Sequence, residues 1–195
     1  MTLMSKIKLA YATPPEWTAT VLDDFDTFLL DHAAAEKKAS GMAVSMLSHY
    51  PDRVELVTAM ADLAIEEMTH YREVVKLIHG RGLITSKDEK DPYVNVFRQS
   101  LRKGSDDYFL DRLLIGGIIE ARGAERFRLI AEALPKGKLK TFYTAISRSE
   151  ERHLDLMIDL AYGYFDSAIV EQRLNELIAI EADIVATLPY RAALH

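Results

Sequence analysis

The chain has 195 residues, enough for one domain with a sizeable buried core. It contains no cysteine, which excludes a disulfide framework, a rubredoxin-type iron site and a thiol nucleophile. The net charge of −6 is not typical of a nucleic-acid-binding protein, although an acidic chain can still present one basic surface. Because neither a signal segment nor a membrane-spanning apolar run is apparent, we expect a soluble cytoplasmic protein.

Two long helices are predicted in the first half of the chain. Residues 13–16 (TPPE) are typical of a helix start, and three- and four-residue apolar steps continue from there to residues 49–50. Pro51 suits the first turn of a second helix, and Gly80 and Gly82 are suited to end it. The short connection between the two predicts a helical hairpin.

A long crossover joins this hairpin to a second one. Residues 83–91 are polar and turn-like, and residues 92–102 are predicted to form a short helix. Two more long helices are predicted over residues 105–134 and 139–164, separated by a short turn that contains Pro and Gly. A fifth, over residues 167–187, is expected to pack against the others. No segment is typical of a strand, so the chain is predicted to be all-α.

Acidic and histidine side chains occupy the apolar stripes of all four long helices. They form two Glu-x-x-His motifs, Glu67 with His70 and Glu150 with His153, and two single glutamates, Glu36 and Glu120. The spacing nearly repeats, because 31 residues separate the single glutamate from the motif in the first hairpin and 30 in the second. Residues three apart on a helix share a face, so each motif can offer a carboxylate and an imidazole to one ion.

Four buried glutamates need compensating charge, because an ionised carboxylate without a partner costs several kcal/mol when buried. Two divalent cations would balance them, and mixed oxygen and nitrogen donors favour iron or manganese over calcium or magnesium. The pattern matches the ligand set of ferritin-like di-metal proteins. We therefore predict a single domain over residues 1–195: a ferritin-like four-helix bundle with a long crossover carrying a short helix and an extra C-terminal packing helix.

In this interpretation the six ligands have three roles. Glu36 and Glu120 are expected to be terminal carboxylates. Glu67 and Glu150 are expected to bridge both ions, and each ion is expected to bind one histidine. The pattern also has a less specific explanation, in which the same side chains are charged surface positions.

Three neighbouring features have alternative explanations. Glu125 could replace Glu120, although it lies about 140° further around the helix. His32, one turn before Glu36, is interpreted as a hydrogen-bonded pocket residue in preference to a seventh ligand. The pair at residues 116–117, two glycines inside a helix, indicates either close helix packing or space for a substrate.

Four stretches around the ligands resemble a known family. They are residues 31–38 (DHAAAEKK), 65–70 (IEEMTH), 119–127 (IEARGAERF) and 149–153 (SEERH). The chain resembles the bacterial tRNA 2-methylthio-N6-isopentenyladenosine hydroxylases over essentially its whole length, with all six ligand positions filled. The resemblance implies a monooxygenase with two non-haem iron ions and O2 as co-substrate, reduced by an external reductase. Its implied reaction is hydroxylation of the isopentenyl side chain of the modified adenosine next to the anticodon.

Other functions fit the same ligand pattern. A ferroxidase or iron-storage protein usually has a carboxylate in place of one histidine, and a rubrerythrin-like peroxidase usually has a cysteine-bound iron domain. A quinone-biosynthesis hydroxylase would need an apolar membrane-facing helix surface. A helical interaction module without metal is a further alternative.

The segment from Arg122 to Arg152 is rich in cations, with eight Lys or Arg against four acidic side chains. Such runs are commonly just solvated surface. RNA binding nevertheless requires cations near phosphates. We therefore expect tRNA to contact Arg126, Arg128, Lys136, Lys138 and Lys140. We also expect no membrane partner and a monomer or weak dimer.

Overall fold

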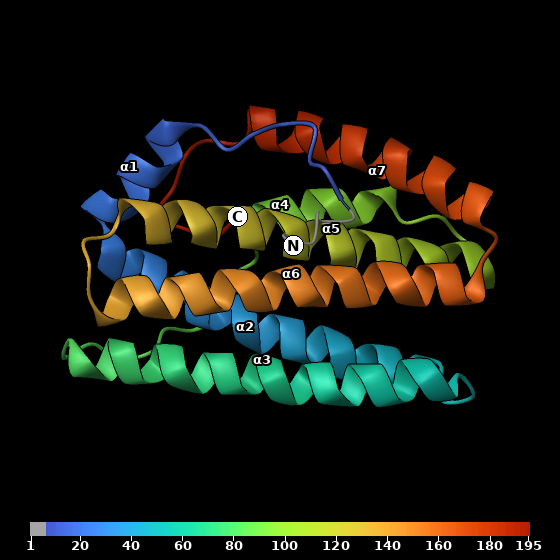
Figure 1. Ribbon diagram of the computed structural model, residues 1–195, viewed down its shortest axis with the longest axis horizontal. Helices are drawn as coiled ribbons and strands as arrows, with labels where there is room; N and C mark the ends of the chain where they lie inside the picture. The colour runs from blue at the N-terminus through green and yellow to red at the C-terminus, as the bar shows by residue number, and fades with distance from the viewer. Residues whose placement is uncertain (1–6) are drawn as a thin grey trace. The chain divides into compact units, whose positions relative to one another are not determined.

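The computed structural model describes residues 7–195, and every regular element in that range is helical, as predicted (Figure 1). The elements are α1 (Pro15–Asp23), α2 (Phe25–His49), α3 (Val54–Gly80), α4 (Pro92–Phe97), the 3-10 turn η1 (Arg98–Ser100), α5 (Ser105–Ala133), α6 (Lys138–Tyr164) and α7 (Ser167–Thr187). No helix in the described range is long and apolar enough to cross a membrane.

The helices belong to two compact units. The α2–α3 unit comprises Ala19–Glu89 and Tyr190–Leu194. The α5–α6 unit comprises Lys90–Pro189, His195 and the described residues before Ala19. Each unit therefore contains one of the two predicted helical hairpins.

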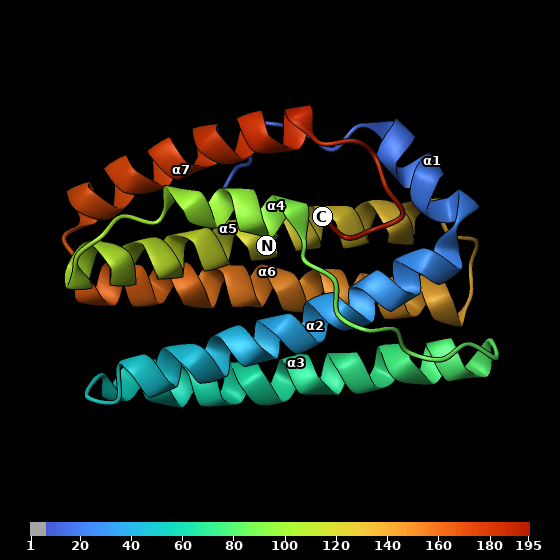
Figure 2. The ribbon, with the colours of Figure 1, turned by 180° about the vertical axis from the view of Figure 1, so that it is seen from behind.

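In the α2–α3 unit, α2 and α3 lie side by side along their length (Figures 1 and 2). Both helices bury apolar side chains, among them Leu29, Ala43, Met46, Leu56, Met60, Leu63, Val74 and Ile78. Ser40 Oγ on α2 donates a buried hydrogen bond to the carbonyl oxygen of Ala64 on α3, at 2.9 Å. This bond ties the two helices together at one register.

The first predicted helix is interrupted at Asp24, whereas the apolar steps predicted one continuous helix. Asp24 has φ −129° and ψ 65°, outside the helical region. Its side chain accepts a hydrogen bond from the backbone N–H of Thr27 at 3.2 Å. Asp24 therefore caps α2 as a new helix, because its carboxylate satisfies one of the amides left over at the helix start.

In the α5–α6 unit, α5 packs along α6, and α7 contacts α4, α5 and α6 (Figure 2). The predicted short crossover helix and C-terminal packing helix are thus confirmed as α4 and α7. Ser147 Oγ on α6 donates a buried hydrogen bond to the carbonyl oxygen of Ala124 on α5, at 3.0 Å. As in the first hairpin, one serine hydroxyl joins the two long helices.

The glycine pair of α5 lies where α5 and α6 approach closely. A Cβ atom built on Gly117 would lie 3.3 Å from Met157 Cβ and 3.2 Å from Ile158 Cδ1. At Gly116 the nearest atom would be the terminal Cε of Met157, at 3.4 Å. Of the two explanations for the glycines, these distances favour close helix packing.

A buried ionic network connects α5 with α7 and with the segment before α1. Arg122 donates from Nε and Nη2 to the two carboxylate oxygens of Glu181, at 2.8 and 3.0 Å, and both side chains are fully buried. Arg122 also pairs with Glu125 and donates to Thr13 Oγ1 at 3.0 Å. Tyr93 donates its hydroxyl hydrogen to Glu181 Oε1 at 3.2 Å. Because the two-point Arg–carboxylate pair is directional, it fixes the rotation of α5 about its axis.

Candidate metal centre

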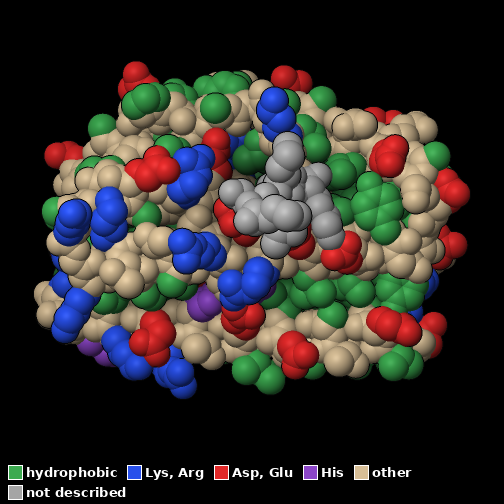
Figure 3. Space-filling view, viewed as in Figure 1, with side chains coloured by type: hydrophobic (Ala, Val, Ile, Leu, Met, Phe, Trp, Pro, Cys, Tyr) green, Lys and Arg blue, Asp and Glu red, His purple; other side chains and the backbone are tan. Residues whose placement is uncertain are grey.

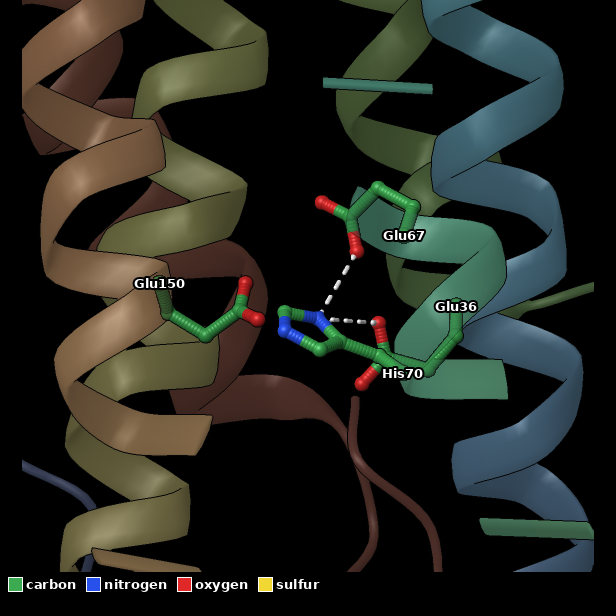
Figure 4. A group of neighbouring side chains, drawn as sticks. All are labelled: Glu36, Glu67, His70 and Glu150. Carbon is green, nitrogen blue, oxygen red and sulfur yellow. Dashed lines mark ion pairs between the residues drawn. The ribbon is translucent and has the colours of Figure 1, made fainter. Parts of the chain in front are cut away.

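The α2–α3 unit brings three predicted ligands together. Glu36 projects from α2, while Glu67 and His70, three residues apart, project from the same face of α3. One ligand atom from each lies within 4.8 Å of the others. His70 Nδ1 is 3.4 Å from Glu67 Oε2 and 3.7 Å from Glu36 Oε2, so the ring stands beside both carboxylates (Figure 4). We call these three residues the first triad.

His32 lies one turn before Glu36 on α2 and contacts it directly. Its Nε2 donates to Glu36 Oε1 at 2.6 Å, and the His32 side chain is fully buried. Burial, together with the nearby His70 ring, lowers the pKa of His32 from 6.5 to about 3, so the imidazole is neutral at pH 7. This contact agrees with the expectation of a hydrogen-bonded pocket residue.

The α5–α6 unit brings the other three predicted ligands together. Glu120 projects from α5, and Glu150 and His153 project from one face of α6; all three are buried. One ligand atom from each lies within 4.8 Å of the others. His153 Nδ1 is 3.8 Å from Glu150 Oε2. This second triad has the same composition as the first, with two carboxylates and one imidazole.

Glu125, the alternative to Glu120, points elsewhere. Its carboxylate accepts hydrogen bonds from the N–H and hydroxyl of Thr13, at 3.2 and 2.6 Å, and pairs with Arg122. Glu125 therefore belongs to the ionic network between α5 and the segment before α1. The wide angle between the two glutamates on α5 explains why only Glu120 joins the second triad.

The two triads are related by an internal repeat. Adding 84 to the residue numbers of α2 gives the equivalent positions of α5, and adding 83 to those of α3 gives the positions of α6. The repeat relates the ligands and also the serine bridges, because Ser40 and Ala64 correspond to Ala124 and Ser147. The three ligands of one hairpin therefore lie at positions equivalent to those of the three ligands of the other.

The donor chemistry of each triad suits a transition-metal ion. Two carboxylates and one imidazole carry a charge of −2, which one divalent cation would balance, and this balance offsets the cost of burying the carboxylates. Mixed oxygen and nitrogen donors suit iron or manganese. The residues present thus fit one such ion at each triad.

The predicted tRNA-contacting cations do not share one environment. Arg128, Lys136 and Lys138 are exposed. The Lys140 side chain instead caps the end of α5, because Nζ donates to the carbonyl oxygens of Glu132 and Leu134, both at 3.1 Å.

Arg126 differs from these surface cations. It is buried, with its guanidinium 4.8 Å from the centre of the Trp17 ring. Burial lowers the pKa of Arg126 to about 10, and the charge of Arg122 acts in the same direction. The structure therefore places Arg126 in the interior, beside the ionic network, and not among the exposed cations.

Known proteins resemble this chain over most of its length. The family described as tRNA-(MS[2]IO[6]A)-hydroxylase (MiaE) matches residues 1–195. A tRNA 2-(methylsulfanyl)-N(6)-isopentenyladenosine(37) hydroxylase of Pseudomonas putida is 31% identical over 177 residues, which cover 91% of this chain and 86% of that protein. A hydroxylase of the same name from Salmonella typhimurium is 28% identical over 155 residues; the match covers 80% of this chain but 56% of that longer protein.

A solved structure resembles the chain equally well. It is described as Protein 43 with aldehyde deformylating oxygenase activity from Synechococcus; the TM-score is 0.92 and the identity 32%, over 97% of this chain and 96% of that one. This similarity confirms the predicted all-α, ferritin-like fold. The match over residues 1–195, together with the Pseudomonas putida relative, shows that the chain belongs to the MiaE family of tRNA hydroxylases.

Proposed function

We propose that the protein is a di-iron tRNA monooxygenase that hydroxylates the isopentenyl side chain of 2-methylthio-N6-isopentenyladenosine next to the anticodon. The main support is that each unit buries the same three donors, in a chain that the tRNA hydroxylase family matches throughout. The proposed ligands of the two iron ions are Glu36, Glu67, His70, Glu120, Glu150 and His153. The internal repeat and the ligand set of ferritin-like proteins support assigning one iron ion to each triad.

The two iron ions, when bound, would activate O2 so that one oxygen atom enters a C–H bond of the isopentenyl group and the other leaves as water. This reaction consumes two electrons and two protons, and the proposal assigns the electrons to an external reductase. The protein contributes four carboxylates that balance the charge of two divalent ions. It also contributes a buried environment that keeps bulk water from the reacting groups.

The metal assignment predicts which substitutions remove iron. His70→Ala and His153→Ala should each lower iron below two per chain and abolish hydroxylation. Glu120→Gln should do the same, whereas Glu125→Gln, the same change on the same helix, should keep its iron because Glu125 belongs to the ionic network. Elemental analysis of the metal and mass spectrometry of tRNA nucleosides measure both results. Full iron content and activity in both histidine variants would contradict the assignment.

We propose further that exposed cations around the turn between α5 and α6 contact tRNA phosphates. Figure 3 shows Lys and Arg side chains gathered over the end of α5 and the start of α6. Lys136 and Lys138 are exposed there, and their positive charge is complementary to an RNA backbone. Arg128 is also exposed, but it pairs with Glu132 at 2.9 Å. The modified adenosine must also leave the base stack before its side chain can reach a buried centre.

A double variant tests this surface. Lys136→Ala with Lys138→Ala should weaken tRNA binding and reduce the slope of log affinity against log salt by about 2, roughly one unit per lost phosphate contact. Lys140 is left intact because it caps α5. The control is Arg72→Ala with Lys76→Ala, which removes equal charge from the exposed face of α3. Equal tRNA affinity in parent and double variant, at low and moderate salt, would show that tRNA docks elsewhere.

A second candidate function is oxygen-dependent deformylation of an aldehyde. One observation favours it, namely the 32% identity to the Synechococcus protein with aldehyde deformylating oxygenase activity. Iron-loaded protein should be assayed with modified tRNA and with an aldehyde under the same electron supply. We expect turnover of tRNA, and turnover of aldehyde alone would favour the second candidate.

Gel filtration tests the expected monomer or weak dimer against an iron-storage cage.

A further inference from the structure

The internal repeat is broken at one position beside the ligands. Glu36 and Glu120 occupy equivalent places in the two hairpins, but the residue one turn earlier differs. In the first hairpin this residue is His32, and in the second it is Gly116. One terminal carboxylate thus has an imidazole on its own helix, where the other has a residue without a side chain.

The two oxygens of Glu36 face different groups. Oε1 accepts the 2.6 Å hydrogen bond from His32 Nε2, while Oε2 lies on the side of His70, 3.7 Å from its Nδ1. His32 has little room to move, because it is fully buried and its ring centre lies 6.0 Å from that of Phe28. The imidazole therefore engages one oxygen of Glu36, and Oε2 is the oxygen that lies nearest to the His70 ring.

We propose that His32 is a positioning residue that makes Glu36 bind metal through Oε2 alone, so that the two metal positions are inequivalent. A chelating carboxylate must turn both oxygens toward the ion, and the bond from His32 opposes that rotation. The position equivalent to His32 is Gly116, which has no side chain that could hold Glu120 in the same way. This inference rests on the proposed function, because it assumes that each triad holds one iron ion.

Loss of a hydrogen bond to a metal ligand typically lowers metal affinity by about 10- to 100-fold. His32→Ala should therefore weaken one of the two binding steps by about that factor and leave the other unchanged. His32→Gln should restore most of the affinity, because the amide N–H of Gln can reach the same carboxylate oxygen. This rescue separates positioning from packing, since Gln does not reproduce the shape of the imidazole ring.

The experiment is a titration of metal-free protein with Fe²⁺ without oxygen, followed by Mössbauer spectroscopy of the ⁵⁷Fe-loaded form. The parent should show two distinct ferrous signals, and His32→Ala should change one of them. Gly116→Ala is the matched control at the equivalent position of the other hairpin, and it should leave both signals unchanged. Circular dichroism establishes that the variants are folded.

Three results would overturn the inference. Parent-like affinities and signals in His32→Ala would show that Glu36 does not need the imidazole. A defect in His32→Gln as large as that in His32→Ala would assign His32 to packing. A parent protein that binds two irons with identical signals would show that the positions are equivalent. If the parent binds fewer than two irons, the proposed di-iron function itself fails, so the two failures are distinguishable.

Discussion

Replacing one or the other of the two adjacent glycines of α5 by Ala should change the free energy of unfolding in opposite directions. Ala in place of Gly inside a helix contributes about 1 kcal/mol of helix propensity. At Gly116 the new methyl group would meet only the flexible end of Met157, at 3.4 Å from Cε and 3.6 Å from Sδ. Because that end can move at little cost, Gly116→Ala should increase the free energy of unfolding by about 0.5–1 kcal/mol.

At Gly117 the same methyl group would lie 3.3 Å from Met157 Cβ, which moves only with the backbone of α6, and 3.2 Å from Ile158 Cδ1. Overpacking of this kind typically costs about 1–3 kcal/mol, which exceeds the propensity gain over most of that range. Gly117→Ala should therefore lower the free energy of unfolding by up to about 2 kcal/mol.

The same change should also lower iron content, because it separates α5 from α6 one turn before Glu120. Chemical denaturation of metal-free protein and elemental analysis of iron-loaded protein measure the two effects. Equal stability of Gly116→Ala and Gly117→Ala would refute the argument from close helix approach.

Two further predictions concern charges outside the triads. Burial would raise the pKa of Asp91, but hydrogen bonds from His195 and from backbone amides outweigh it and lower this pKa from 3.8 to about 2. The stabilisation is present above pH 3.8 and is lost as the pH falls toward 2. Asp91→Asn should therefore reduce the free energy of unfolding at pH 7 by about 2 kcal/mol. Denaturation curves should show that this difference from the parent shrinks below pH 4. Glu181→Gln leaves the buried guanidinium of Arg122 without its two-point carboxylate and should cost about 3 kcal/mol or more in urea unfolding; a loss below 1 kcal/mol would contradict the role of this pair.

The ligand triads could be predicted from the sequence because their geometry is mostly local. Glu67 and His70 share a helix face through a spacing of three residues, and Glu150 and His153 do the same. Apolar periodicity then indicates which face is buried, and it favours Glu120 over Glu125. Helix existence and ligand choice were therefore accessible from spacing alone.

Other features were missed because they depend on side-chain partners far away or on a local exception. Arg126 looked like a surface cation, but Trp17, far away in the sequence, stacks on it. Arg122 pairs with Glu181, 59 residues further on, and no periodic pattern encodes that pairing. The break at Asp24 was hidden because the apolar steps continue across it, and only the capping bond of its own carboxylate stops the helix.

The serine bridges show how a duplicated hairpin can keep a contact while exchanging the residue that makes it. In the first hairpin the hydroxyl belongs to the leading helix, at Ser40, and in the second it belongs to the trailing helix, at Ser147. A position-by-position comparison of the halves finds Ser against Ala twice, yet both halves have the same helix-to-helix bond. The two hairpins therefore share the helix-to-helix hydrogen bond and not the position of the serine. Ser40→Ala alone should lose the bridge, whereas Ser40→Ala combined with Ala64→Ser should be tolerated.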